Sequence, residues 1–151
     1  MSRVREILSV KGDHVRTITP DTLLVRAAQR MRAEQVGAFV VSTDGERIEG
    51  LVAERDIVHA LARHGASAAE LAVSAVMTRA VITCAPNDTV RSVMTEMTRA
   101  RVRHLPVVDG ARLCGIISIG DVVKACIDDA DLETGVIRDA YLAQRAGLAN
   151  A

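Results

Sequence analysis

The stretch GIISIGD at residues 115–121 ends an apolar run with three residues that could bind a ligand. The carboxylate of Asp121 offers two acceptor oxygens, which is enough to hold both hydroxyls of a ribose diol. The hydroxyl of Ser118 can donate to a phosphate, and Gly120 lets a ligand approach the backbone closely. A helix that begins near Asp121 would direct free backbone N–H groups toward the same point. This hinge therefore predicts a site for a phosphorylated ribose.

The same residues also have a purely structural interpretation. Asp121, and Asp56 at the corresponding place earlier in the chain, both precede predicted helices, and aspartate is a preferred helix N-cap. Ser118 taken alone suits a turn or a cap equally well. Capping and ligand binding are compatible, so both roles stay open, and the repeated pattern around the hinge favours the ligand.

An internal repeat supplies the elements that must position this hinge. The chain aligns with itself at an offset of about 66 residues, which drops to about 65 after the turn in each half. The aligned residues are Val15, Thr17, Pro20, Asp44, Gly45 and Asp56 with Val81, Thr83, Pro86, Asp109, Gly110 and Asp121. A register that holds over most of each half indicates a duplication.

Each half predicts the same succession of elements. An extended piece precedes an amphipathic helix, two strands follow with an Asp-Gly hairpin turn between them, and a second helix closes the unit. The predicted ranges are 15–20, 22–35 and 56–64 in the first half, and 81–86, 88–101 and 121–129 in the second. Neither half can bury both faces of its small sheet alone. The sequence therefore predicts an α+β (α/β) fold of two β-α-β-β-α repeats, packed about a pseudo-two-fold axis.

The composition argues against several classes of protein. The 19 basic and 19 acidic residues cancel, and only one tyrosine and one phenylalanine occur, so no nucleic-acid surface is expected. The three cysteines lie far apart and form no C-x-x-C motif, which predicts no metal site and a reducing compartment. No apolar run approaches the ~18 residues of a membrane span, and no signal peptide is recognised. We expect a cytoplasmic protein without a membrane partner.

The doubled unit, with its early P..TL..A...M pattern and its late PVVD…L.G..S..D pattern, resembles the cystathionine-β-synthase (CBS) domain. Two such units in tandem resemble a Bateman module, with repeat 1 at residues 3–65, repeat 2 at 73–128 and a helical tail at 131–151. The resemblance implies a regulatory module rather than an enzyme, without catalytic residues or a catalytic cofactor. In this family the cleft between the repeats binds an adenosine-containing ligand: AMP, ADP, ATP and sometimes NAD or S-adenosylmethionine.

The resemblance also implies two unequal ligand sites. In the family pattern Ser118 touches the phosphate and Asp121 the ribose, while Thr83 lies beside the base or ribose. The basic stretch at Arg103 and His104 has no counterpart in the first half, which suggests phosphates near repeat 2. The stronger site is expected to comprise Thr83, Arg103, His104, Ser118, Gly120 and Asp121. The weaker site is expected to comprise Thr17, Ala38, Arg55 and Asp56, because Ala53 stands where the family carries serine or threonine.

A second interpretation is an interaction module with a vestigial cleft, which regulates an unidentified protein partner and responds to the redox state of its thiols. We also expect a homodimer, because residues 131–148 offer an amphipathic surface that a monomer leaves partly exposed. The tail has loosely spaced apolar residues (Leu132, Val136 and Ala140), which predict a helix lying on the surface of the module or on a partner.

Overall fold

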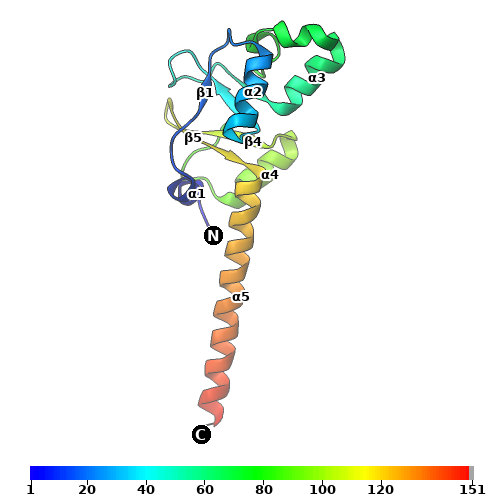
Figure 1. The fold of residues 1–151 in the computed structure, drawn as a ribbon. Helices are drawn as coiled ribbons and strands as arrows, with labels where there is room; N and C mark the ends of the chain where they lie inside the picture. The colour runs from blue at the N-terminus through cyan, green and yellow to red at the C-terminus, as the bar shows by residue number, and fades with distance from the viewer. Residues whose placement is uncertain (150–151) are drawn as a thin grey trace.

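The computed structural model describes residues 1–149, and the side chains of residues 1–146, as a rounded body from which one long helix projects (Figure 1). The first repeat forms a three-stranded sheet in the order β1-β2-β3, with β1 parallel to β2 and β2 antiparallel to β3. Its elements are β1 (Thr17–Ile18), α2 (Leu24–Glu34), β2 (Ala38–Val41), β3 (Gly50–Ala53) and α3 (Glu54–His64).

The second repeat builds a two-stranded antiparallel sheet from β4 and β5. Its elements are α4 (Val90–Ala100), β4 (His104–Asp109), β5 (Arg112–Ser118) and α5 (Ile119–Ala149). The predicted extended piece at 81–86 contributes an isolated parallel bridge between Cys84 and Val107. This bridge corresponds to the pairing of Ile18 with Val41 in the first repeat. The predicted α+β fold with two equivalent halves is therefore confirmed.

The helices α2 and α4 follow from the same spacing of apolar residues in both halves. The buried residues are Leu24, Ala27 and Met31 in α2, and Val90, Val93 and Met97 in α4. Each helix ends in a left-handed residue, Gln35 with a φ of 54° or Arg101 with a φ of 55°. Because both helices end in the same way, the strand that follows each of them starts from an equivalent place.

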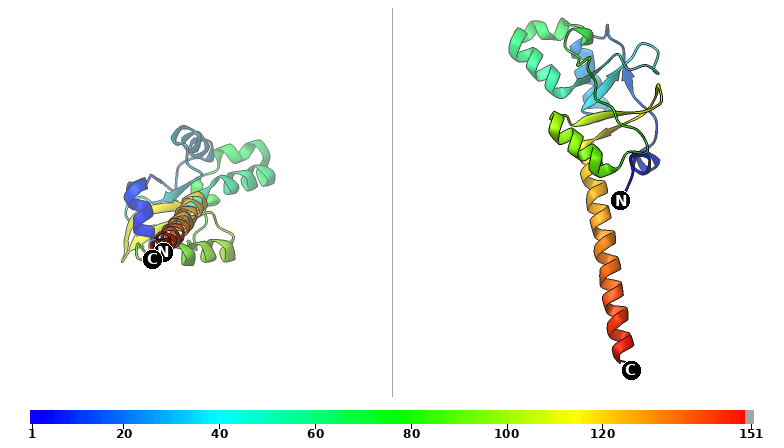
Figure 2. Two further views of the ribbon diagram at one scale, coloured as in Figure 1. Left: turned by 90° about the horizontal axis from the view of Figure 1, so that it is seen from below. Right: turned by 180° about the vertical axis from the view of Figure 1, so that it is seen from behind.

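The first helix, α1 (Val4–Lys11), packs on the second repeat (Figure 2). Val4 is fully buried and Leu8 nearly so, in one core cluster with Val107 and Ile117. The N–H of Val4 donates to the Asp88 carbonyl at 3.0 Å, which fixes the start of the helix. The core of the second repeat is thus completed by residues at the beginning of the chain, which the sequence groups with the first repeat.

The linker between the repeats makes the opposite contribution. Its two 3₁₀ turns, η1 (Gly65–Glu70) and η2 (Val73–Ala75), place Ala68 and Val73 in the core cluster of the first repeat. The Leu24 N–H donates to the Leu71 carbonyl at 2.9 Å, so the linker also holds the start of α2. Each repeat is therefore closed by the segment that precedes the other one.

Helix α5 continues without interruption from Ile119 to Ala149 and leaves the body after its first turns (Figures 1 and 2). The sequence predicts a helix that ends at 129 and a separate tail from 131. The structure joins them, because no proline and no capping glycine lies between. The tail is helical as expected but does not lie on the module: residues 130–146 are exposed apart from the half-buried Gly135. No helix among residues 1–149 is long and apolar enough to cross a membrane.

Candidate functional site

A cavity of about 420 Å³ lies where the two repeats meet. One side is the end of β3 with the first turn of α3, and the other is the start of β4 with the two residues before it. Its polar lining consists of Glu54, Arg55, Asp56, Thr78, Arg103 and His104. Its apolar lining includes Leu51, Val58, Val81, Ile82, Val102 and Leu105. This combination of a few polar groups with an apolar wall is typical of small-molecule sites.

Asp56 lies in the first turn of α3, where its carboxylate supports the start of the helix. Its Oδ2 accepts the N–H of Ala53 at 2.8 Å, across the junction between β3 and α3. Within the described part of the chain, Oδ1 makes no hydrogen bond. The predicted N-cap position is therefore wrong, since Ala53 is the N-cap and Asp56 is the third residue of the helix, where its side chain bonds back to the cap. This bond leaves one carboxylate oxygen available to a ligand.

Three basic side chains line the same cavity. Arg55 donates through Nη1 to the Arg101 carbonyl at 3.2 Å, a bond that joins the first repeat to the second. Arg103 and His104 approach from the second repeat. Arg103 forms no ion pair with any side chain between residues 1 and 146. The guanidinium of Arg103 is therefore not held in an ion pair, although Glu54 and Asp56 line the same cavity.

His104 is held close to the backbone of the first repeat. A Cβ atom at Gly37 would lie 3.2 Å from the ring atoms Cε1 and Nε2, so glycine leaves the space that the imidazole needs. Burial lowers the pKa of His104, and the positive charges of Lys11 and Arg103 act in the same direction against Glu54 and Asp121. The imidazole is therefore neutral at neutral pH, although it lies beside two carboxylates.

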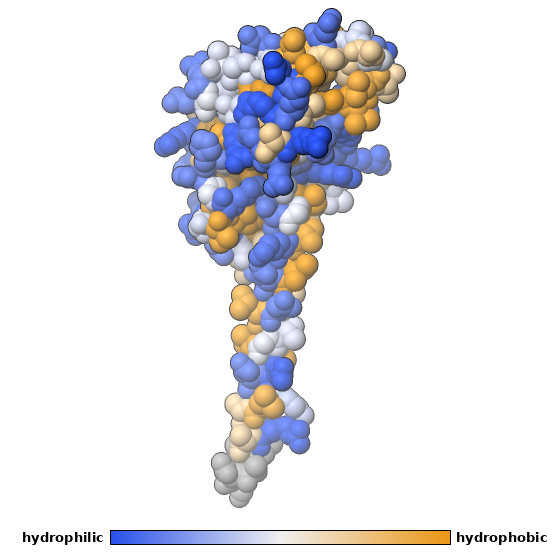
Figure 3. Space-filling view, in the orientation of Figure 1, coloured by the Kyte–Doolittle hydropathy of each residue, from blue (hydrophilic) through white to orange (hydrophobic). Residues whose placement is uncertain are grey.

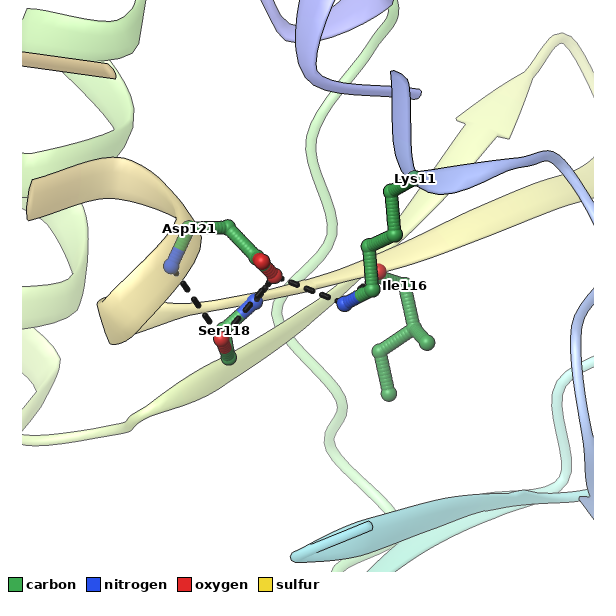
Figure 4. Close-up of polar contacts among 4 residues, drawn as sticks. All are labelled: Lys11, Ile116, Ser118 and Asp121. Carbon is green, nitrogen blue, oxygen red and sulfur yellow. Dashed lines mark hydrogen bonds and ion pairs between the residues drawn. The ribbon is translucent and has the colours of Figure 1, made fainter. Parts of the chain in front are cut away.

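The other hinge carboxylate, Asp121, is already engaged (Figure 4). Its Oδ2 accepts from Lys11 Nζ at 2.6 Å, from the Ser118 N–H at 2.7 Å and from the Ser118 hydroxyl at 2.9 Å. Lys11 Nζ also donates to the Ile116 carbonyl at 3.1 Å. Burial acts to raise the pKa of Asp121, but the bonds from Lys11 and Ser118 outweigh it and lower that pKa. All three bonds end on Oδ2, and Oδ1 makes no hydrogen bond within residues 1–146.

Asp121 lines a separate cavity of about 400 Å³ between α1 and α5, together with Lys11 and Lys124. Arg103 and His104 lie beside the hinge at 118–121, since His104 pairs with Ser118 in the sheet and the Arg103 carbonyl accepts the Ile119 N–H at 2.8 Å. Both also line the cavity of Arg55 and Asp56. The hinge of the first repeat faces the start of β4, so Arg103 and His104 lie between the two hinges.

Five of the predicted residues line neither of these cavities. Thr83 and Gly120 are exposed, Ser118 and Thr17 are half-buried, and Ala38 is buried in β2. The lining residues that sequence reasoning missed include Gly37, Glu54, Val58, Thr78, Val81 and Ile82. Glu54 could have been predicted, because it is a charged residue two positions before Asp56 at the hinge of the first repeat. The small and apolar residues could not, because their side chains have no polar group that would indicate a ligand site.

The cysteines and acidic residues give little support to thiol or metal chemistry. Burial raises the pKa of the Cys84 thiol to about 12, and it also raises the pKa of Cys114. Thiols of this kind stay protonated and react slowly. Among the described residues, no group of three or more histidine, cysteine or acidic side chains is placed to hold a metal ion. The structure therefore offers no observation in favour of a thiol-dependent switch.

Comparison with known proteins agrees with the duplicated architecture. A model of the CBS domain matches residues 4–63 and again residues 73–128. The chain is 35% identical over 115 residues to the CBS domain-containing protein CBSX3, mitochondrial, of Arabidopsis thaliana, covering 74% of this chain and 56% of that protein. It is 30% identical over 122 residues to the CBS domain-containing protein YhcV of Bacillus subtilis, covering 81% and 84%. The chain thus spans little more than half the length of the Arabidopsis relative.

The fold is also that of a solved structure. The crystal structure of the CBS-domain containing protein ATU1752 from Agrobacterium tumefaciens has a TM-score of 0.79 and 44% sequence identity. The alignment covers 82% of this chain and 98% of that one. With both halves of its sequence and its whole body matched in this way, the chain belongs to the CBS domain family, as a tandem pair of CBS domains that forms a regulatory module.

Proposed function

We propose that the cavity between the repeats binds an adenosine-containing nucleotide, such as AMP, ADP, ATP or NAD, and that the chain is a non-enzymatic sensor of this ligand. The observation that carries the proposal is the meeting of three features in one cavity. These are a carboxylate with a free oxygen, a set of basic side chains and an apolar wall. They correspond to the three parts of a nucleotide: ribose, phosphate and base.

Each part of the ligand has a suitable partner. The free Oδ1 of Asp56 can accept hydrogen bonds from the ribose hydroxyls. Arg103 can bind a phosphate through two parallel N–H donors, and the N-terminal turn of α3 adds its positive end to the same cavity. The side chains of Val81 and Ile82 offer an apolar surface to the flat face of adenine.

The position of the cavity also suggests how occupancy is transmitted. A ligand changes a conformational equilibrium only by binding one state better than the other. Arg55 lines the cavity and at the same time bonds the Arg101 carbonyl of the second repeat. A phosphate that attracts the Arg55 guanidinium would compete with this bond. Binding would then shift the relative orientation of the two repeats.

Isothermal titration with AMP, ATP, NADH and S-adenosylmethionine tests the proposal. We expect at least one of them to bind saturably with a single molecule per chain, because Arg103 and His104 line the cavity of Asp56 and not the cavity of Asp121. Arg103→Ala should weaken this binding, whereas Arg112→Ala on the exposed end of β5 should not. No binding of any of the four ligands would contradict the proposal and would leave the interaction module as the better interpretation.

Nucleotide affinity should also rise as the pH falls. In the free protein the pKa of His104 is lowered, so the ring is neutral at pH 7.5. A bound phosphate favours the imidazolium and raises this pKa, so binding takes up a proton and is stronger at pH 6 than at pH 8. Titrations of NADH, whose diphosphate bridge does not change charge over this range, measure the slope. His104→Gln should flatten it, and an unchanged slope in that variant would exclude His104 as the cause.

A further inference from the structure

The outer part of α5 has no support from the body of the protein. The Asp129 carboxylate accepts from the Ser2 N–H at 2.9 Å and from the Ser2 hydroxyl at 2.6 Å, which ties the inner part of the helix to the N-terminus. From residue 130 to residue 146 the helix is exposed apart from the half-buried Gly135. Figure 3 shows apolar side chains along this projecting part of the molecule.

These apolar side chains are more exposed than is usual for a helix without a binding partner. Ile127, Ile137 and Tyr141 have exposed fractions of 55%, 69% and 57%. Most of the stability of protein helices comes from packing an apolar face, because an isolated helix in water is only marginally stable. A helix with large exposed apolar residues over this length therefore needs a partner surface.

One continuous stripe is suited to such packing. The α5 seam, as we call it, consists of Val123, Ile127, Ala130, Thr134, Ile137 and Tyr141. Successive members are alternately four and three residues apart, which is the spacing of the core positions of a coiled coil, and none is charged. Leu132 and Val136 lie on the other side of α5, where the same alternating spacing includes Asp129 and Asp139. The seam is thus the apolar face without carboxylates.

We propose that the α5 seam pairs in parallel with the same seam of a second copy of this chain. In a parallel pair, the residue just before one seam position approaches the residue five places later on the other helix. Glu133 and Arg138 have this spacing, so each copy would contribute its Glu133 to the Arg138 of the other. Among the described residues, neither side chain forms an ion pair. Two new ion pairs would then flank the apolar seam.

The charges also favour this orientation over the reverse one. An antiparallel pair would gain Asp131 against Arg138, but it would place Lys124 against Arg145, which are like charges. The small side chain of Ala130 lets the two helices approach closely near the middle of the seam. The two bodies then lie at the same end of the paired helices.

Sedimentation equilibrium of Ile137→Asp and Val136→Asp tests the pairing. The two residues are neighbours with exposed fractions of 69% and 68%, so neither substitution disturbs the core. We expect wild type and Val136→Asp to be dimeric, and Ile137→Asp to raise the dissociation constant by more than roughly tenfold, because it buries a charge in the seam. A monomeric wild type, a fully dimeric Ile137→Asp or a dissociated Val136→Asp would each overturn the proposal.

Disulfide formation tests the orientation. A parallel pair sets residue 137 beside its own copy, so Ile137→Cys should form an intermolecular disulfide on mild oxidation. Leu132→Cys, on the outer face, should not, and both variants retain the same three native cysteines. Equal cross-linking of the two variants, or none in Ile137→Cys, would exclude parallel pairing through this seam.

Discussion

Asp56→Asn is expected to remove most of the nucleotide-induced rise in melting temperature while leaving the free protein close to wild type. The side-chain oxygen of asparagine can still accept the Ala53 N–H from the first turn of α3. Its NH₂ group, however, would replace the free Oδ1 by a donor, which cannot accept from a ribose hydroxyl. A ligand at 100 times its dissociation constant stabilises the fold by about 2.7 kcal/mol, or roughly 5–10 °C for a chain of this size. Thermal unfolding with and without nucleotide measures the loss.

Asp121→Asn is the matched control for this experiment, since it changes the corresponding carboxylate of the other repeat. It weakens the contact with Lys11, so the free protein should melt at a slightly lower temperature. The nucleotide-induced shift should persist, because Asp121 does not line the cavity between the repeats. If Asp121→Asn loses the shift and Asp56→Asn keeps it, the ligand binds at the second hinge and displaces Lys11.

Leu8→Ala should destabilise the protein by about 2–5 kcal/mol, which is the usual cost of such a truncation in a core. Leu8 lies directly on β5: a Cβ atom added at Gly115 would be 2.6 Å from its Cδ2. The side chain fills the core of the second repeat, although it belongs to the first helix of the chain. Urea unfolding monitored by circular dichroism gives the difference in the free energy of unfolding.

Val10→Ala serves as the control for Leu8→Ala, because Val10 lies on the same helix but is 87% exposed. Its removal should change the free energy of unfolding by less than about 0.5 kcal/mol. Equal effects of the two truncations would mean that α1 does not dock on the second repeat in solution.

The repeats and their helices could be predicted because their signals are local. The apolar period of Leu24, Ala27 and Met31 identifies α2 from the sequence, and the same spacing identifies α4. The hinge aspartates are likewise recognisable, because a carboxylate that starts a helix has a short-range role. Asp56 bonds a backbone N–H only three residues away.

The composition of the site could not be predicted because it depends on contacts between distant segments. Arg103 and Asp56 line the same cavity only because the two repeats pack face to face. The sequence of one repeat alone contains no signal for this contact. The engagement of Asp121 by Lys11 is of the same kind, since it requires α1 to lie on the second repeat. Helix α5 illustrates another limit. Its inner turns pack against the core, whereas its outer turns pack against nothing within the described residues. The sequence is helical throughout, so it does not show where the packing ends.

The docking of α1 has a consequence for the order in which the chain is completed during synthesis. The bond from Lys11 to the Ile116 carbonyl joins residues that are 105 positions apart. At about 5–20 residues per second, α1 leaves the ribosome on the order of 5–20 s before the strand on which it rests. The linker turns that close the first repeat emerge much earlier. A chain that stops before β5 would therefore expose the apolar side chains of Val4 and Leu8 to solvent. Chaperones and proteases act on chains with exposed apolar segments of this kind, so such a truncated chain would be a substrate for them.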